Sequence, residues 1–135
     1  MKNCEMCMTD TESLNHKFKY WKLLMPPKPL FLKGYIIITP LEHKEFWNDI
    51  SEEEFVEFGV LISRIESALK KFIPLERLYS ITISEQVRHL HVHLIPRLKG
   101  SEHKGIDLIQ AATKSYSNES NNKELFELFI QEITN

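Results

Sequence analysis

Several features are scarce in this chain of 135 residues, and each shortage excludes a class of protein. The apolar runs are short: "YIIIT" at 35–39 is among the longest, far below the roughly 20 residues of a membrane-spanning helix. The first ten residues, "MKNCEMCMTD", lack the apolar core of a signal peptide, and no repeat or low-complexity tract is found. The sequence therefore predicts a cytoplasmic protein that does not engage a membrane.

An excess of charge of one sign is also lacking, because the formal net charge is −2. No global basic field would attract nucleic acid, so nucleic acid is not an expected partner. The apolar content of 42% and charged content of 27% are ordinary for a soluble globular protein. The length suits one domain with a real core, and we predict a single domain over 1–135, with a core at 4–97 and an extension at 98–135.

Cysteine is limited to Cys4 and Cys7, which are spaced as C-x-x-C. In a reducing compartment, this spacing indicates a metal site or a redox pair rather than a structural disulfide. Two ordinary thiols near a frayed terminus are the remaining interpretation.

The pattern of the remaining chain predicts strands at 16–25, 35–39, 78–84 and 88–95, with "PPKP" at 26–29 ending the first of them. The last two strands would form a hairpin with a tight turn around Glu85–Gln86. Ser51 and Glu54 form a capping box that opens the clearest helix. Its apolar stripe comprises Phe55, Phe58, Ile62, Ile65 and Leu69.

A second amphipathic helix is predicted near the C-terminus, while the polar segment 99–120 has no clear assignment. The stripe of this helix comprises Phe126, Phe129, Ile130 and Ile133. The predicted fold class is therefore α+β, with a mostly antiparallel sheet covered by one long helix and a C-terminal helix.

The segment "RHLHVHLIPR" at 88–97 places His89, His91 and His93 at every second position. Because a strand repeats every two residues, the three imidazoles would leave one face, and Leu90 and Val92 would point into a core. The arrangement has three interpretations: a half-exposed strand that carries histidines without function, a metal site, or nucleophilic catalysis by one imidazole with a neighbouring ring as proton partner.

The segment "HLHVHLIPR" resembles the histidine triad (HIT) motif, in which apolar residues separate three histidines. The resemblance extends to "GYIIITPLEH", the capped helix and the hairpin, and it covers roughly residues 4–97. It implies a half-barrel sheet. The "IPR" ending is similar to the branch that contains dinucleoside polyphosphate hydrolases.

The resemblance implies nucleotide chemistry at the motif. The middle histidine, His91, would attack the α-phosphorus of a nucleotide, form a nucleotidyl-histidine and be released by water. His93 would contact the phosphate or the leaving group, and no catalytic metal would be required. Arg97 would stabilise polyphosphate charge, although an ordinary surface arginine is the alternative.

The resemblance also implies a structural zinc site. Some histidine triad proteins and the related uridylyltransferases bind zinc through an N-terminal C-x-x-C and two histidines. The matching residues here are Cys4, Cys7, His43 and His89. Two thiolates and two imidazoles suit a closed tetrahedral zinc site, which would remove His89 from catalysis.

The sequence departs from the family pattern in two places. "MPPKP" at 25–29 holds no Asp or Asn that could bind a ribose, and the loop before the triad is shortened to "SEQVR". Ser84 and Gln86 in this loop would donate to phosphates, whereas Glu85 would repel a phosphate if it pointed inward.

The function predicted by the resemblance is that of a nucleotide hydrolase or transferase, with a dinucleoside polyphosphate or related adenylated compound as substrate. A nucleotide- or zinc-binding regulatory protein with little turnover is the alternative, because a fold alone does not imply activity. A metalloenzyme that uses the triad as ligands ranks lower, since Glu85 is the only nearby acidic partner. The resemblance also implies a homodimer, for which Phe55, Val60 and Phe72 are apolar contact candidates.

Overall fold

The computed structural model describes residues 4–7, 15–25, 34–114 and 121–135. For residues 113–114 and 121–122 it describes the backbone alone. It contains one sheet of five strands, and all neighbouring strands are antiparallel. In spatial order the strands are β1 (Asn15–Lys17), β2 (Trp21–Leu24), β3 (Ile36–Pro40), β5 (Val92–Leu98) and β4 (Leu75–Ile81). Together with the helices, this sheet confirms the predicted α+β class.

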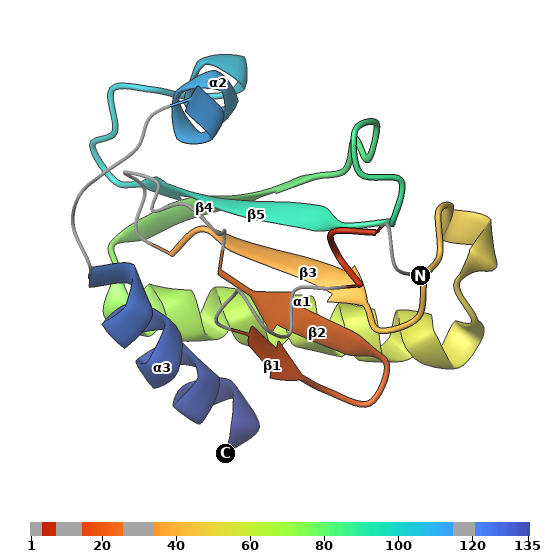
Figure 1. The fold of residues 1–135 in the computed structure, drawn as a ribbon. Coiled ribbons are helices and arrows are strands. Elements are labelled where there is room, and N and C mark those ends of the chain that lie inside the picture. The colour runs from red at the N-terminus through yellow and green to blue at the C-terminus, as the bar shows by residue number, and fades with distance from the viewer. Residues whose placement is uncertain (1–3, 8–14, 26–33, 115–120) are drawn as a thin grey trace.

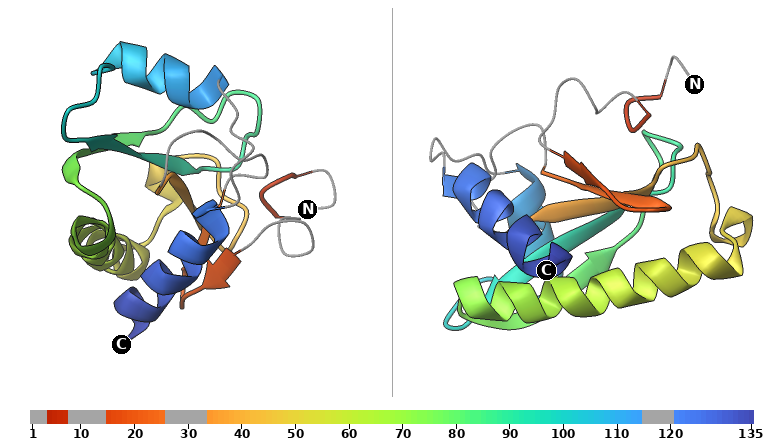
Figure 2. Two further views of the ribbon diagram at one scale, coloured as in Figure 1. Left: turned by 90° about the vertical axis from the view of Figure 1, so that its left-hand side faces the viewer. Right: turned by 90° about the horizontal axis from the view of Figure 1, so that it is seen from below.

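The long helix α1 (Glu52–Phe72) and the C-terminal helix α3 (Asn121–Thr134) lie on one side of the sheet. The shorter helix α2 (Ile106–Lys114) lies on the opposite side, as Figure 1 and the left view of Figure 2 show. A one-turn 3₁₀ helix at Trp47–Asp49 precedes α1. Among the described residues, no helix combines the length and the apolar character needed to cross a membrane.

Two apolar clusters follow from this layering. Trp21, Ile38 and Leu94 belong to the larger one, which α1 and α3 cover with Ile65 and Phe129. The smaller cluster joins Ile37 and Ile95 of the opposite sheet face to Leu108 of α2 and to Cys4 and Met6 of the N-terminal segment. The sheet face under α1 and α3 is therefore mostly apolar core, with His16 and Ser80 as polar side chains at its edge strands, and the opposite face carries more polar side chains.

The capping box predicted for α1 is confirmed. The Ser51 hydroxyl accepts from the Glu54 backbone N–H, and Glu54 Oε1 accepts from the Ser51 N–H, both at 3.2 Å. The predicted stripe is only partly right, because Phe55 is 42% exposed while Leu61 and Ala68 are buried. The stripe of α3 is right: Phe126, Phe129 and Ile133 are buried and Ile130 packs against them.

The single strand predicted at 16–25 is wrong, because the chain turns at residues 18–20 to form the β1–β2 hairpin. The Glu57 carboxylate of α1 stabilises this turn by accepting the backbone N–H groups of Tyr20 and Trp21, at 2.7 and 2.9 Å. The "PPKP" break at 26–29 lies outside the described residues.

The predicted hairpin of the last two strands is confirmed, but its boundaries and its tight turn are wrong. The strands are β4 at Leu75–Ile81 and β5 at Val92–Leu98, so residues 82–91 form a long connection. Ser84 in this connection has a φ of +54°, a conformation that few residues other than glycine adopt. The polar segment at 99–120, for which the sequence predicted no structure, includes helix α2.

Candidate functional site

The three histidines lie where the 82–91 connection enters β5. His93 is inside the strand and pairs with Ile37 of β3 and Ile81 of β4, whereas His89 and His91 precede the strand. The predicted alternation of histidines and apolar residues between two faces is nevertheless confirmed, because Leu90, Val92 and Leu94 are all buried in the cluster under α1. The histidines therefore face the opposite side, where His91 and His93 lie with ring centroids 5.0 Å apart.

The backbone around His91 is tied down on both sides. The Leu90 N–H donates to the Lys44 carbonyl at 2.7 Å, and the Leu90 carbonyl accepts from the buried Thr39 hydroxyl at 2.7 Å. These bonds fix the peptide units that carry His89 and His91, although the segment is outside regular strand structure. A fixed backbone gives the rings a fixed direction.

His91 is oriented by the carbonyl of His89. Its Nδ1 lies 2.7 Å from that oxygen, and a carbonyl can only accept, so Nδ1 carries the proton. In the neutral form of the ring, the lone pair is then on Nε2. His91 is buried, with 7% of the residue exposed. This tautomer is the one that a nucleophilic imidazole needs.

His93 is oriented by Tyr35, a residue that the sequence patterns did not single out. The Tyr35 hydroxyl lies 2.6 Å from His93 Nδ1. Burial raises the pKa of Tyr35 to about 12. Burial, together with the neighbouring His91, lowers the pKa of His93 to about 4. Both groups are therefore neutral near pH 7.

The four residues of the implied zinc site lie together, and their candidate ligand atoms are all within 4.8 Å of one another. The Nδ1 atom of His89 is 3.4 Å from both the Cys4 and Cys7 sulfurs, and His43 Nδ1 is 3.6 Å from the Cys7 sulfur. Tetrahedral zinc with ordinary bond lengths separates neighbouring sulfur and nitrogen ligands by about 3.5 Å, so the residues fit this metal.

The chemistry of the donor atoms supports the same fit. His89 Nε2 donates to the Pro40 carbonyl at 3.0 Å, which leaves the Nδ1 lone pair directed at the sulfurs. Burial lowers the pKa of His89 to about 4, so the ring is neutral, as a ligand must be. Burial and the neighbouring Cys4 raise the pKa of the Cys7 thiol, so a bound cation is needed to stabilise two adjacent thiolates.

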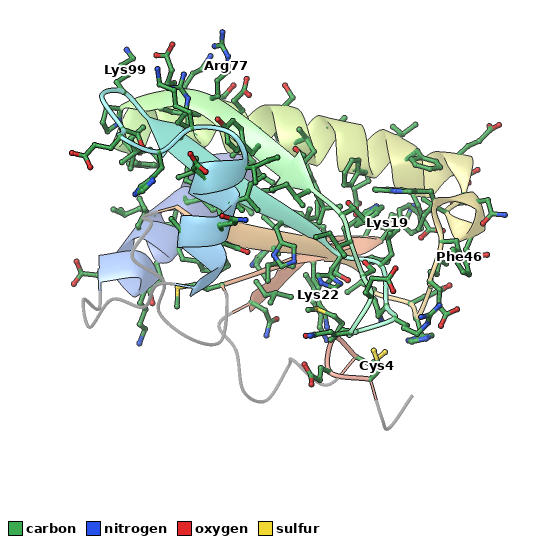
Figure 3. All side chains as sticks on the ribbon, turned by 90° about the horizontal axis from the view of Figure 1, so that it is seen from above. Cys4, Lys19, Lys22, Phe46, Arg77 and Lys99 are labelled. Carbon is green, nitrogen blue, oxygen red and sulfur yellow. The ribbon has the colours of Figure 1, made fainter. Side chains whose placement is uncertain are left out.

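Lys22 is a second residue that the sequence analysis missed. It is 2% exposed on β2, and its ammonium group donates to the Met6 carbonyl at 2.8 Å, between the two cysteines. Figure 3 shows Lys22 and Cys4 toward the same edge of the molecule. The lone charge inside the apolar run "YWKLLM" was the available signal, since its neighbours Trp21 and Leu23 belong to the core.

The predicted substrate-binding residues Ser84, Gln86 and Arg97 lie at different distances from the histidines, and only Ser84 contacts His91. The Ser84 hydroxyl contacts His91, 3.4 Å from its backbone N–H and 3.5 Å from Nδ1. Gln86 is exposed and lines a cavity of about 290 Å³ beside Cys4 and His43. Glu85 is exposed as well and lines a separate cavity with Ser84.

Arg97 is not brought next to the triad. It lies four residues along β5 from His93, about 13 Å at the rise of a strand, with buried Ile95 between them on the same face. Its guanidinium is 4.0 Å from the Glu76 carboxylate. Its partner in the sheet register, Arg77, lies at the end of the molecule opposite Cys4 in Figure 3.

The family follows from a comparison with known domains. The HIT domain, as a family model, matches residues 23–100, which is more than half of the chain. The chain belongs to the HIT domain family. The HIT match includes the end of β2, all of β3, α1, β4 and β5, and all three histidines of the motif.

Solved HIT structures share this fold at low sequence identity. A hypothetical histidine triad nucleotide-binding protein from Sulfolobus tokodaii strain7 is 17% identical, with a TM-score of 0.72 over 97% of this chain and 92% of that chain. A zinc-bound histidine triad family protein from Mycobacterium smegmatis is 15% identical, with a TM-score of 0.73 over 98% and 94%. Diadenosine triphosphate hydrolase from Plasmodium falciparum is 20% identical, with a TM-score of 0.62 over 90% and 76%.

Proposed function

We propose that this HIT protein is an enzyme that breaks nucleoside phosphoryl bonds at the α-phosphorus through a covalent intermediate on His91. The observation that supports this most strongly is the 2.7 Å contact between His91 Nδ1 and the His89 carbonyl, which leaves the Nε2 lone pair free. His91 also lies outside the cluster of candidate metal ligands, so no metal would compete for that lone pair.

The proposed reaction has two steps. First, the Nε2 lone pair of His91 forms a bond to the α-phosphorus, and the bond from that phosphorus to the bridging oxygen breaks, so the oxygen leaves with the electron pair. Second, a water oxygen bonds to the phosphorus, the P–N electron pair returns to Nε2, and a water proton passes to solvent. The products are a nucleoside monophosphate and the leaving phosphate compound.

We propose an adenylated compound such as a dinucleoside polyphosphate as the substrate. The structural likeness to a diadenosine triphosphate hydrolase and the "IPR" ending of the motif favour this class. Ser84 and Gln86 remain the proposed phosphate contacts. Arg97 is far from His93 along β5, so we propose that it contacts only a part of the substrate distant from the α-phosphorus.

We also propose that the cysteine and histidine cluster holds zinc in a structural role. Cys4, Cys7, His43 and His89 would bind it, and zinc would supply a fixed crosslink between the N-terminal segment and the end of the sheet. The likeness to a zinc-bound family protein supports this proposal. His89 would then have its ring fixed by the metal while its carbonyl orients His91.

Release of nucleoside monophosphate from a panel of adenylated and uridylylated compounds tests the proposed function. The wild-type protein should release a monophosphate from at least one of them. His91→Ala should reduce the rate by at least about a thousandfold, because the bond-forming atom is lost. His93→Ala should reduce it on the order of a hundredfold, because it removes stabilisation alone.

His103→Ala is the matched control, because His103 is an exposed histidine in the loop before α2 and should leave the rate unchanged. A wild-type rate in His91→Ala would contradict the proposal. Tight nucleotide binding without release of monophosphate from any compound would instead favour a regulatory binding protein.

A further inference from the structure

Tyr35 has a more specific role than packing, and its place in the sheet explains why. In the antiparallel register Ile36 pairs with Leu94 and Ile37 with His93, so Tyr35 leaves the same face as His93 and is its diagonal neighbour. Diagonal side chains in a sheet are about 7–8 Å apart at their bases, a gap that an aromatic side chain can bridge. The rings meet edge to face, with centroids 5.8 Å apart and an interplanar angle of 87°.

The local backbone holds Tyr35 at this position. Gly34 directly before it has a φ of +86°, which a residue with a Cβ rarely adopts. A Cβ at Gly34 would also come within 3.2 Å of the Leu69 and Ile73 side chains of α1 and its C-cap. Tyr35 as a whole residue is 4% exposed, so packing fixes the direction of its side chain.

The direction of the hydrogen bond decides where His93 carries its proton. A phenol hydroxyl is a stronger hydrogen-bond donor than acceptor, and the unprotonated nitrogen of a neutral imidazole is a strong acceptor. We therefore infer that the Tyr35 hydroxyl donates to Nδ1 of His93, which leaves the ring proton on Nε2. His91 has the opposite tautomer, because its Nδ1 faces a carbonyl. Two adjacent histidines of one motif therefore present different groups: a lone pair on His91 and an N–H on His93.

We propose that Tyr35 is a positioning residue that holds His93 as a hydrogen-bond donor toward the phosphoryl or leaving-group oxygen. This inference rests on the proposed function for its kinetic consequence, although the tautomer of His93 can be measured without any substrate. Tyr35 itself does not touch the reacting atoms in this scheme. It acts through His93, which without the phenol could exchange tautomers and present a lone pair in place of the N–H.

The test compares Tyr35→Phe with Tyr79→Phe in two measurements. Tyr79 is a matched control because it is also a diagonal neighbour of His93, across the β4–β5 ladder, and belongs to the same apolar cluster as Tyr35. Its hydroxyl, however, accepts from the Gly105 N–H at 2.9 Å. The first measurement is long-range ¹H–¹⁵N NMR of the histidine rings at pH 7.5, with His93 assigned from the signals lost in His93→Gln. The second is steady-state kinetics of monophosphate release.

We expect the wild-type protein and Tyr79→Phe to show His93 with its proton on Nε2. Tyr35→Phe should show a mixture of tautomers, with kcat lowered about 3- to 10-fold and KM little changed, as expected for the loss of one hydrogen bond that aids the reaction step. A wild-type His93 protonated on Nδ1 would overturn the proposal. So would a Tyr35→Phe variant with a wild-type kcat, whether or not its tautomer changes.

The two measurements also separate this proposal from the proposed function. If the wild-type protein releases no monophosphate from any compound, the proposed function fails, and the NMR result alone supports or overturns the action of Tyr35 on His93. If circular dichroism shows that Tyr35→Phe does not fold, the tautomer of His93 in the wild-type protein still decides the matter.

Discussion

His91 and His93 are chemically identical side chains whose Nδ1 atoms face different partners, and in the proposed scheme this difference makes them different reagents. A backbone carbonyl faces one and a phenol hydroxyl faces the other, at 2.7 and 2.6 Å. Neither partner is charged, so the difference does not depend on an ion pair that salt could screen. The proposed division of labour in the motif would therefore follow from the neutral groups placed beside each ring.

The low pKa of His93 predicts how stability depends on pH. The folded protein keeps this ring neutral down to about pH 4, whereas an unfolded chain would protonate it below about pH 6.5. The unfolded state thus binds more protons than the folded state between these pH values. The contribution of neutral His93 to the free energy of unfolding is therefore fully present above about pH 6.5 and is lost as the pH falls toward 4.

His93→Gln should make the free energy of unfolding less dependent on pH in this window. The slope should decrease by up to one proton, or about 1.4 kcal/mol per pH unit. Urea unfolding of the zinc-loaded protein at several pH values from 4.5 to 7.5 measures it, with His103→Gln as an exposed control. Equal slopes for His93→Gln and the wild-type protein would contradict a depressed pKa at His93.

At the residue scale, sequence spacing was sufficient to single out the triad and the cysteine pair, whereas the four residues of the metal cluster came from the resemblance to the family. The spacing C-x-x-C and the alternation of histidines are local, and the family pattern supplied His43. Tyr35 and Lys22 could not be found in this way. Their contacts join β3 to β5 and β2 to the N-terminal segment, so they depend on a strand register that no local pattern records.

Among the elements, α1 was the most predictable because its start is encoded by two neighbouring side chains, Ser51 and Glu54. Strand boundaries were less predictable. The alternation of apolar residues continues from Leu90 through Val92 into β5, although the ladder begins only at Val92. The Leu90 N–H donates to the Lys44 carbonyl, and the Leu90 carbonyl accepts from the Thr39 hydroxyl. These bonds replace the ladder there, so a side-chain pattern alone overestimates the length of the strand.

The N-terminal segment and the sheet should be coupled through the metal site. His43→Ala should abolish stoichiometric zinc binding and lower Tm by more than about 5 °C, because the ligands are brought together only in the folded state. His103→Ala should retain one zinc per chain and the wild-type Tm. Elemental analysis of tag-free protein and calorimetry measure both quantities. A wild-type zinc content in His43→Ala would show that the proposed ligand set is wrong.

For the whole molecule, the position of β4 at an edge of the sheet bears on whether two chains can pair. An edge strand presents unpaired backbone groups to a partner, and α1 exposes Phe55, Val60 and Phe72 at 42%, 45% and 36%. Both features favour the predicted homodimer, in which two sheets join into one.

That a single domain spans 1–135 likewise remains a prediction.

Light scattering on a size-exclusion column tests the dimer. The wild-type protein at micromolar concentration should have about twice the chain mass of 16.0 kDa. Val60→Glu should shift it toward the monomer, because a charge would be buried in the contact. Ile106→Glu is the control, since Ile106 is 72% exposed at the start of α2, on the opposite side of the sheet. A monomeric wild-type protein would sink the prediction.

The covalent step on His91 is the central claim, and mass spectrometry of the quenched reaction tests it most directly. The enzyme is mixed with diadenosine triphosphate, quenched at alkaline pH to preserve a P–N bond, digested and fragmented so that His91 and His93 are distinguished. We predict an adenylyl group on His91 in the wild-type protein and none in His91→Ala. An adduct on His93, or rapid turnover with no adduct on His91 at any quench time, would contradict the account.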